Sequence, residues 1–260
     1  MRRKLHVYLY LLKISFKTLT HYRMTTFLVV AFGFLFTFID VLSTIVFFQF
    51  TEELGGFNFY EVMYILGVYN FIQYSYQLFF INSHEELADK IIEGELDYDL
   101  IRPIDSNFLI NFRSLDIPSL INFILPISII IFSILNIEYT FIDFYGAIIL
   151  IFFGTILYYY INQVIVNLCF WIEKPGMILG IPEYLLDIAS RPASIYPKYI
   201  SFALTFVMPM FVITNSSVIA INSSALYIYL SIFLLVYIII FRYISNKQWK
   251  YGLKKYLSTN

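Results

Sequence analysis

The chain has 260 residues, of which 60% are hydrophobic and only 13% are charged, and its mean hydropathy is +0.74. Soluble domains usually carry about 25% charged residues, so this composition indicates a membrane protein. The net charge of −1 excludes the overall basic field of a nucleic-acid-binding protein, and the single Cys169 excludes an intrachain disulfide and any CxxC metal or redox site.

Residues 1–22 predict an amphipathic helix that lies in the membrane interface. A basic and polar stripe faces an apolar one on the helical wheel, as such helices require. The stripe consists of Arg2, His6, Lys13, Lys17, Thr20 and His21. An amphipathic helix packed on protein is the alternative. No small-residue cleavage site follows the first long apolar run, so we expect this segment to be retained rather than removed as a signal peptide.

Five later apolar runs are long enough to cross a bilayer: 26–50, 60–81, 117–135, 141–171 and 226–244. Lys and Arg occur before the first run, in the 82–116 loop and in the tail, but not in the short loops 51–59 and 136–140. Because cytoplasmic loops carry the excess of Lys and Arg, both termini and the 82–116 loop should be cytoplasmic. That parity leaves room for one further crossing within 172–222.

Two stretches compete for that crossing, 175–192 and 201–221. Hydropathy favours 201–221, because Glu183 and Asp187 in the first stretch are costly in lipid. Pro209 and the polar run "TNSS" instead suggest that 201–221 is a broken, re-entrant element. These arguments leave both assignments open. No internal repeat or flexible linker divides the chain, so we expect one membrane domain over 1–260.

The segment 83–105, "SHEELADKIIEGELDYDLIRPID", holds eight acidic and two basic residues. It predicts a short amphipathic helix with Leu87 and Ile91 on one face and Gly94 as its C-cap. The chain should then turn, because Pro103 disfavours a helical conformation at Arg102. Such a surface helix suits docking onto a soluble domain that moves; a solvated loop is the alternative.

The run "IIEGELDYDLIRPID" (91–105) resembles the signature of ABC-2-type transporter permeases, in the branch whose ATPase is encoded separately. The matching positions are Ile91, Gly94, Leu96, Leu100, Arg102 and Pro103. The stretch 191–213 is similar to that family's "P-x-x-I-Y-P … P-F" region near the outer face. Its matches are Pro192, Ile195, Tyr196, Pro197 and Pro209, while Met210 departs from the usual Phe.

The resemblance implies an all-α membrane protein with six transmembrane helices, an N-terminal interfacial helix (1–22) and a re-entrant outer element (193–222) before the last helix. It makes 172–192 the fifth crossing and 83–113 a cytoplasmic coupling loop that presses into a groove on an ATPase. The candidate coupling residues are Glu86, Lys90, Ile91, Glu93, Gly94, Leu96, Asp97, Leu100, Arg102 and Pro103. Those of the outer region are Pro192, Tyr196, Pro197 and Pro209.

Polar residues inside the apolar runs are a further set of candidates. Asp40 lies near the middle of the first run, and a carboxylate in that place is a functional candidate. Gln73 and Gln77 share one helix face, as do Gln163 and Asn167, since each pair is four residues apart. The residues predict either a polar transport path or contacts within the bundle and at a subunit seam.

No phosphate loop (GxxxxGK[ST]), HExxH or GxSxG motif occurs. We therefore expect no catalytic residue, no bound metal and no cofactor on this chain, with ATP and Mg on a partner ATPase. The leading hypothesis is the transmembrane subunit of an ATP-driven exporter in the bacterial cytoplasmic membrane. Its partners would be a soluble ATPase in two copies, a second permease subunit, identical or related, and membrane lipids. An ATPase-independent channel or scaffold is the alternative hypothesis, and an intramembrane enzyme is the third. The sequence does not identify the transported substrate.

Overall fold

The computed structural model describes residues 23–101, 110–111, 114–172, 176–223 and 226–259. The expected interfacial helix at 1–22 and the residues Arg102 and Pro103 lie outside these ranges. Within them the chain is almost entirely helical and has no strand. The all-α class predicted from the sequence is confirmed for the part of the chain that is described.

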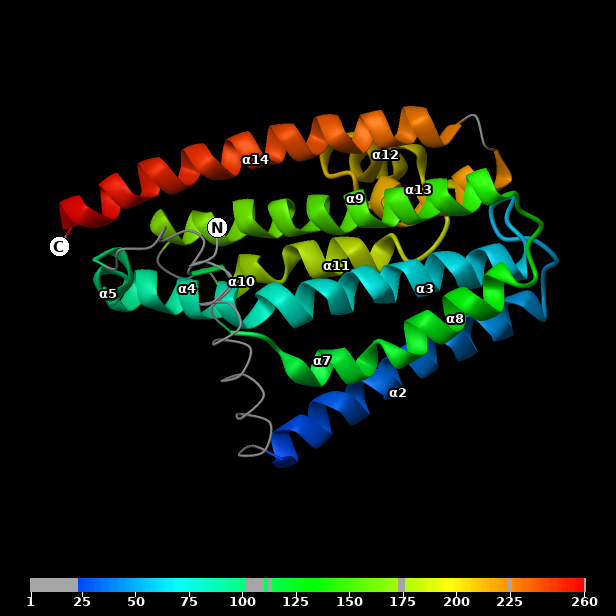
Figure 1. Cartoon of the computed structure of the whole chain (residues 1–260), viewed down its shortest axis with the longest axis horizontal. Helices are drawn as coiled ribbons and strands as arrows, with labels where there is room; N and C mark the ends of the chain where they lie inside the picture. The colour runs from blue at the N-terminus through cyan, green and yellow to red at the C-terminus, as the bar shows by residue number, and fades with distance from the viewer. Residues whose placement is uncertain (1–22, 102–109, 112–113, 173–175, 224–225, 260) are drawn as a thin grey trace.

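The helices run side by side along the long axis of the molecule (Figure 1). The longer elements are α2 (Arg23–Phe48), α3 (Phe59–Tyr76), α4 (Asn82–Glu93), α8 (Ile124–Ile134), α9 (Phe141–Val166), α13 (Met210–Asn222) and α14 (Leu226–Thr259). The short ones are η1 (Gln77–Ile81), α5 (Asp97–Leu100), α7 (Ile117–Asn122), η2 (Asn167–Phe170), α10 (Gly176–Leu179), α11 (Ile181–Ile188), η3 (Ala193–Ile195), α12 (Lys198–Phe202) and η4 (Ala203–Val207).

Four described helices are long and apolar enough to cross a membrane: Arg23–Phe48, Ile117–Ile134, Phe141–Phe170 and Leu226–Tyr256. They correspond to four of the predicted runs. A fifth candidate is the pair Lys198–Val207 and Met210–Asn222, which passes the same test but is bent by 92°. The structure thus supports a multi-pass helical protein with four or five candidate spans.

The predicted run 60–81 forms the central helix of the bundle and is not one of these candidates. Helix α3 begins at a capping box in which the Asn58 side chain accepts from the Glu61 N–H and Glu61 accepts from the Asn58 N–H. Fifteen of its 18 residues are buried, and it packs between α8 and α11 (Figure 1). Protein rather than lipid surrounds α3, so it tolerates polar residues such as Asn70 and Gln73.

The stretch 172–192, which the resemblance made the fifth crossing, is not one continuous helix. Its described part folds into the short helices α10 and α11, and α11 ends inside the protein at Ala189, which is fully buried. The last carbonyls of a helix have no partner within it. Here the Thr214 hydroxyl donates to the Ala189 carbonyl at 2.6 Å, and the Tyr196 hydroxyl donates to that of Ile188 at 2.8 Å. These two side chains allow α11 to stop in the interior.

The break predicted near Pro209 is present. Met208 is extended (φ −123°, ψ 93°), as expected for a residue that precedes proline, and separates η4 from α13 at the 92° bend. Helix α13 carries the "TNSS" residues 214–217, all of them buried. The polar run therefore faces protein, which is the condition under which such residues persist within a membrane domain.

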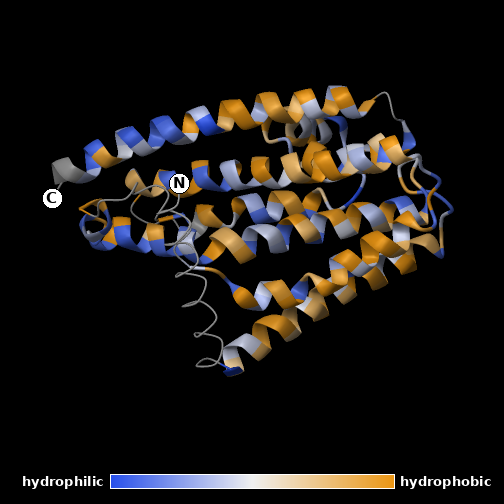
Figure 2. Ribbon diagram, in the orientation of Figure 1, coloured by the Kyte–Doolittle hydropathy of each residue, from blue (hydrophilic) through white to orange (hydrophobic). Residues whose placement is uncertain are grey.

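The described segments richest in hydrophilic residues lie at one end of the molecule. Figure 2 shows hydrophobic residues along most of α2, α8, α9 and the first half of α14, and hydrophilic ones on α4 and on the last half of α14. A second, smaller core lies there, formed by Leu87, Ala88, Ile91, Leu96, Ile110, Val166, Cys169, Phe170, Trp249 and Tyr256. It fixes α4 and the C-terminal end of α14 side by side.

Candidate functional site

The charged segment, residues 82–101, continues directly from the central helix. Residues 59–93 are helical without a break, although η1 (77–81) has the wider π-helical winding. Gly94 ends the helix with φ 77°, and its N–H donates to the Lys90 carbonyl. A left-handed residue at that place favours glycine, so the predicted C-cap is confirmed. The expected surface loop thus begins as a continuous helical extension of α3.

One face of α4 is anchored, as its amphipathic pattern predicted. Leu87 and Ile91 are buried in the smaller core, and Leu96 is fully buried after the turn. The Lys90 ammonium contacts the Asp99 carboxylate at 2.5 Å and that of Glu86 at 3.1 Å, which ties α4 to α5. The segment is folded and held in place, in contrast to the solvated loop that the sequence left as an alternative.

The opposite face of the charged segment is open. Glu93 and Asp97 are exposed, and Leu100 is half-buried. Three large apolar side chains are also exposed among the acids: Ile92 by 50%, Tyr98 by 70% and Ile101 by 80%. Exposed apolar groups on an acidic protrusion are typical of a protein-docking surface.

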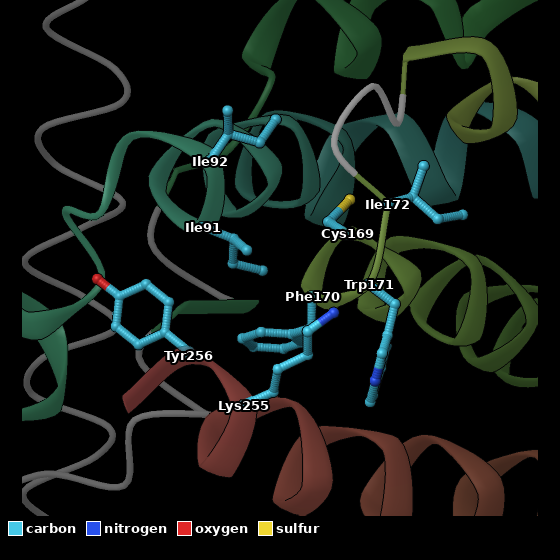
Figure 3. Close-up of a pocket in the computed structure, with 8 residues that line it drawn as sticks. All are labelled: Ile91, Ile92, Cys169, Phe170, Trp171, Ile172, Lys255 and Tyr256. Carbon is cyan, nitrogen blue, oxygen red and sulfur yellow. The ribbon is translucent and has the colours of Figure 1, made fainter. Parts of the chain in front are cut away.

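A small pocket of about 260 Å³ lies where α4, η2 and α14 meet (Figure 3). Figure 3 shows Ile91 and Ile92 on one side, Phe170 and Trp171 on another, and Lys255 and Tyr256 below. A Cβ at Gly252 on α14 would collide with the Phe170 ring, so glycine is required for α14 to approach η2 this closely.

A larger cleft of about 730 Å³ lies between α2, α3, α7 and α11. We call it the acidic cleft, because Asp40, Glu183 and Asp187 line it. Other polar residues in its wall are Thr25, Tyr69, Asn70, Gln73, Tyr74, Gln77 and Asn122. It brings together Asp40, Gln73 and Gln77, which the sequence proposed as one candidate group.

Hydrogen bonds order the wall of the acidic cleft. Gln73 donates to the Glu183 carboxylate at 2.7 Å and accepts from the Tyr158 hydroxyl at 3.1 Å. The Tyr69 hydroxyl donates to the Asp187 carboxylate at 3.2 Å. Both acceptors belong to α11, so these bonds hold α11 against the central helix and aim its carboxylates at the cleft.

Gln163 and Asn167 lie elsewhere. They belong to a buried network in which Gln163 contacts His84 at 3.0 Å and donates to Asn167 at 3.0 Å, and Asn167 donates to the Ser245 carbonyl at 3.2 Å. His84 also contacts the Tyr76 hydroxyl at 2.9 Å. The network joins α3, α4, α9 and α14, which matches the alternative of contacts within the bundle.

The sequence reasoning did not propose Glu183, Asp187, Tyr69 and Tyr74 as cleft residues. It treated the two α11 carboxylates only as an obstacle to insertion in lipid. Their four-residue spacing, which places both on one helix face, was the signal that could have revealed them. In the outer region, Pro192 and Pro197 precede η3 and α12 as extended residues. Across the described ranges, no group of three His, Cys, Asp or Glu could hold a metal ion.

The comparisons with known proteins agree with this architecture. The family model described as "ABC-2 family transporter protein" matches residues 34–260, which is most of the chain and includes the charged segment and the three carboxylates of the acidic cleft. No curated protein and no solved structure matches. The chain therefore belongs to the ABC-2 transporter family and is a transport permease of that type.

Proposed function

We propose that this permease is the transmembrane subunit of an ATP-driven exporter. The observation that carries the proposal is the unbroken helical path from residue 59 to residue 93. This helical path carries Gln73 and Gln77, which line the acidic cleft. Its last residue, Glu93, is one of the exposed acids of the charged segment. A displacement of the charged segment would therefore be transmitted along the helix to the acidic cleft.

The free energy for transport would come from ATP hydrolysis by a partner protein. Two copies of a soluble ATPase would bind ATP and Mg and close on each other, and this chain would contribute no catalytic residue. Closure would bias the bundle between inward-open and outward-open states. The π-helix η1, between cleft and charged segment, is the point where we expect the helix to adjust, because π-bulges recur at functional positions.

A second permease subunit, identical or related, would complete the pathway. Helix α2 supports this, since Thr37 and Thr44 are its only buried residues. The face of α2 beside the acidic cleft would lie at the seam with the second subunit. The other exposed apolar surfaces of the bundle would contact membrane lipids.

The proposed topology has both termini and the charged segment in the cytoplasm of a bacterial cell. Six crossings would include α3 inside the bundle and a fifth, short crossing by α10 and α11. The bent pair at Pro209 would form the re-entrant outer element at 193–222, and residues 1–22 would lie along the inner leaflet. The alternation of basic loops supports this orientation.

The test is purification from cells that carry the gene. The wild-type chain should bring down an ABC-type ATPase in mild detergent, identified by mass spectrometry, whose hydrolysis rate depends on the permease. The double variant Glu93→Lys/Asp97→Lys should reduce ATPase association and permease-dependent hydrolysis at least about tenfold. Both native side chains are exposed, and the substitutions reverse the local charge. The control Glu52→Lys/Glu53→Lys changes as many exposed acids elsewhere.

Coupled hydrolysis that survives the charge reversal would refute the role of the charged segment. A chain that purifies without any ATPase, yet conducts solutes in vesicles without ATP, would instead be the channel considered as the alternative.

A further inference from the structure

The charged side chains described in the lining of the acidic cleft are all carboxylates. Asp40, Glu183 and Asp187 line it, and none of the described lining residues is Lys, Arg or His. A carboxylate at membrane depth is costly unless a counter-charge compensates it. Among the residues that the structure describes, the lining of the cleft thus carries only negative formal charges.

Arg191 lies close enough to Asp40 to interact with it electrostatically, and its hydrogen bonds go to α2. Arg191, one turn after Asp187, donates to the Ser43 hydroxyl at 2.6 Å and to the Thr44 hydroxyl at 2.5 Å. Its guanidinium also lies 5.8 Å from the centre of the Phe47 ring. These contacts join the segment that follows α11 to α2. One arginine beside three carboxylates leaves an excess of negative charge among the described residues of this region.

An independent feature indicates a ligand that donates hydrogen bonds. Asn122 on α7 lines the cleft and is 2% exposed, and its side-chain oxygen has no hydrogen-bond partner. A buried amide oxygen without a donor is costly, so such groups normally have one. Gly33 on α2 faces this amide, because a Cβ at Gly33 would collide with it. Glycine there leaves the space that the Asn122 side chain occupies at the cleft wall.

Aromatic residues in the rest of the cleft wall could contact the apolar part of a ligand. Phe32 and Phe36 line the cleft on α2, and their stacked rings lie 6.3 Å apart. Aromatic faces attract organic cations as well as apolar groups. The lining therefore combines negative charge, a free acceptor and aromatic surface.

We propose that the acidic cleft binds an amphiphilic organic cation with an N–H-bearing ammonium group. The carboxylates would supply the counter-charge, Asn122 would accept an N–H, and the two phenylalanines would contact the apolar body. The inference rests on the proposed transport function, because it assigns a cargo class to the pathway.

The probe is dansylcadaverine, a fluorescent primary amine, titrated onto the full-length chain in phosphatidylcholine nanodiscs. We expect saturable binding, at least about tenfold weaker for the N-acetylated neutral analogue. The isosteric variant Asp40→Asn/Glu183→Gln/Asp187→Asn should lose at least about tenfold in affinity, and Asn122→Ala about threefold or more. Glu138→Gln, an exposed carboxylate remote from the cleft, is the matched control.

Equal affinity for the neutral analogue, unchanged affinity in the triple variant, or no saturable binding by the wild type would each overturn the inference. Circular dichroism of every variant checks that the helices are intact. Failure of the ATPase association together with normal cation binding would count against the exporter and leave the cation site standing. The opposite pair of results would remove the cation site alone.

Discussion

The Tyr256 hydroxyl accepts a hydrogen bond from the backbone N–H of Leu96 at 3.2 Å, across 160 residues of sequence. Both residues are buried, at 5% and 0% exposed. This bond fastens the turn of the charged segment to the last turns of α14. The last described turns of α14 thus hold in place the segment that we propose an ATPase contacts.

Tyr256→Phe should destabilise this junction by about 1–3 kcal/mol, because it leaves the buried Leu96 N–H without its acceptor. The melting temperature in detergent should fall, and hydrogen exchange of the Leu96 amide should accelerate. Tyr251→Phe is the control, since Tyr251 is 60% exposed. Identical exchange at Leu96 in wild type and Tyr256→Phe would contradict the assignment.

Lys90→Met should destabilise the chain by about 1.5–3 kcal/mol, because it removes the hydrogen bond that the ammonium donates to the Asp99 carboxylate, whose side chain is 1% exposed. The double variant Lys90→Met/Asp99→Asn should recover much of the loss. Glu86→Gln should cost less than about 1 kcal/mol, since the Glu86 side chain is 36% exposed. Thermal denaturation of the wild type and the three variants compares these losses; equal losses in Lys90→Met and Glu86→Gln would disprove the buried pair.

Stability should decrease in mild acid because of His84, which lies in α4 beyond the candidate spans. Burial lowers the pKa of His84 from 6.5 to about 4, so the folded chain keeps it neutral while the unfolded chain protonates it. The stability is complete above pH 6.5 and is lost as the pH falls toward 4, by up to roughly 3 kcal/mol. Unfolding measured from pH 8 to 5 should show this slope in the wild type and a smaller one in His84→Gln. Parallel curves would exclude His84 as the source.

Local features of the sequence predicted much of the fold. The Gly94 C-cap, the break at Pro209 and the amphipathic face of Leu87 and Ile91 each depend on a few neighbouring residues. Four spanning helices followed from apolar runs, since hydropathy is a property of contiguous sequence.

Other features depended on residues far apart in the chain. Hydropathy marked the run that holds α3, but only packing showed that this helix lies at the centre of the bundle. By hydropathy, Glu183 and Asp187 only disfavour insertion of their segment in lipid. In the fold they line the same cleft as Asp40 and accept hydrogen bonds from Gln73 and Tyr69.

The sequence alone determined a multi-pass helical membrane protein with a charged, capped segment after its second long helix. Only the tertiary structure decided that this segment extends the central helix without a break, that α11 ends inside the protein on Thr214, and that three distant carboxylates share one cleft. The physical reason is that caps and hydropathy act between neighbours, whereas the partner of a buried polar group is chosen by how the helices pack.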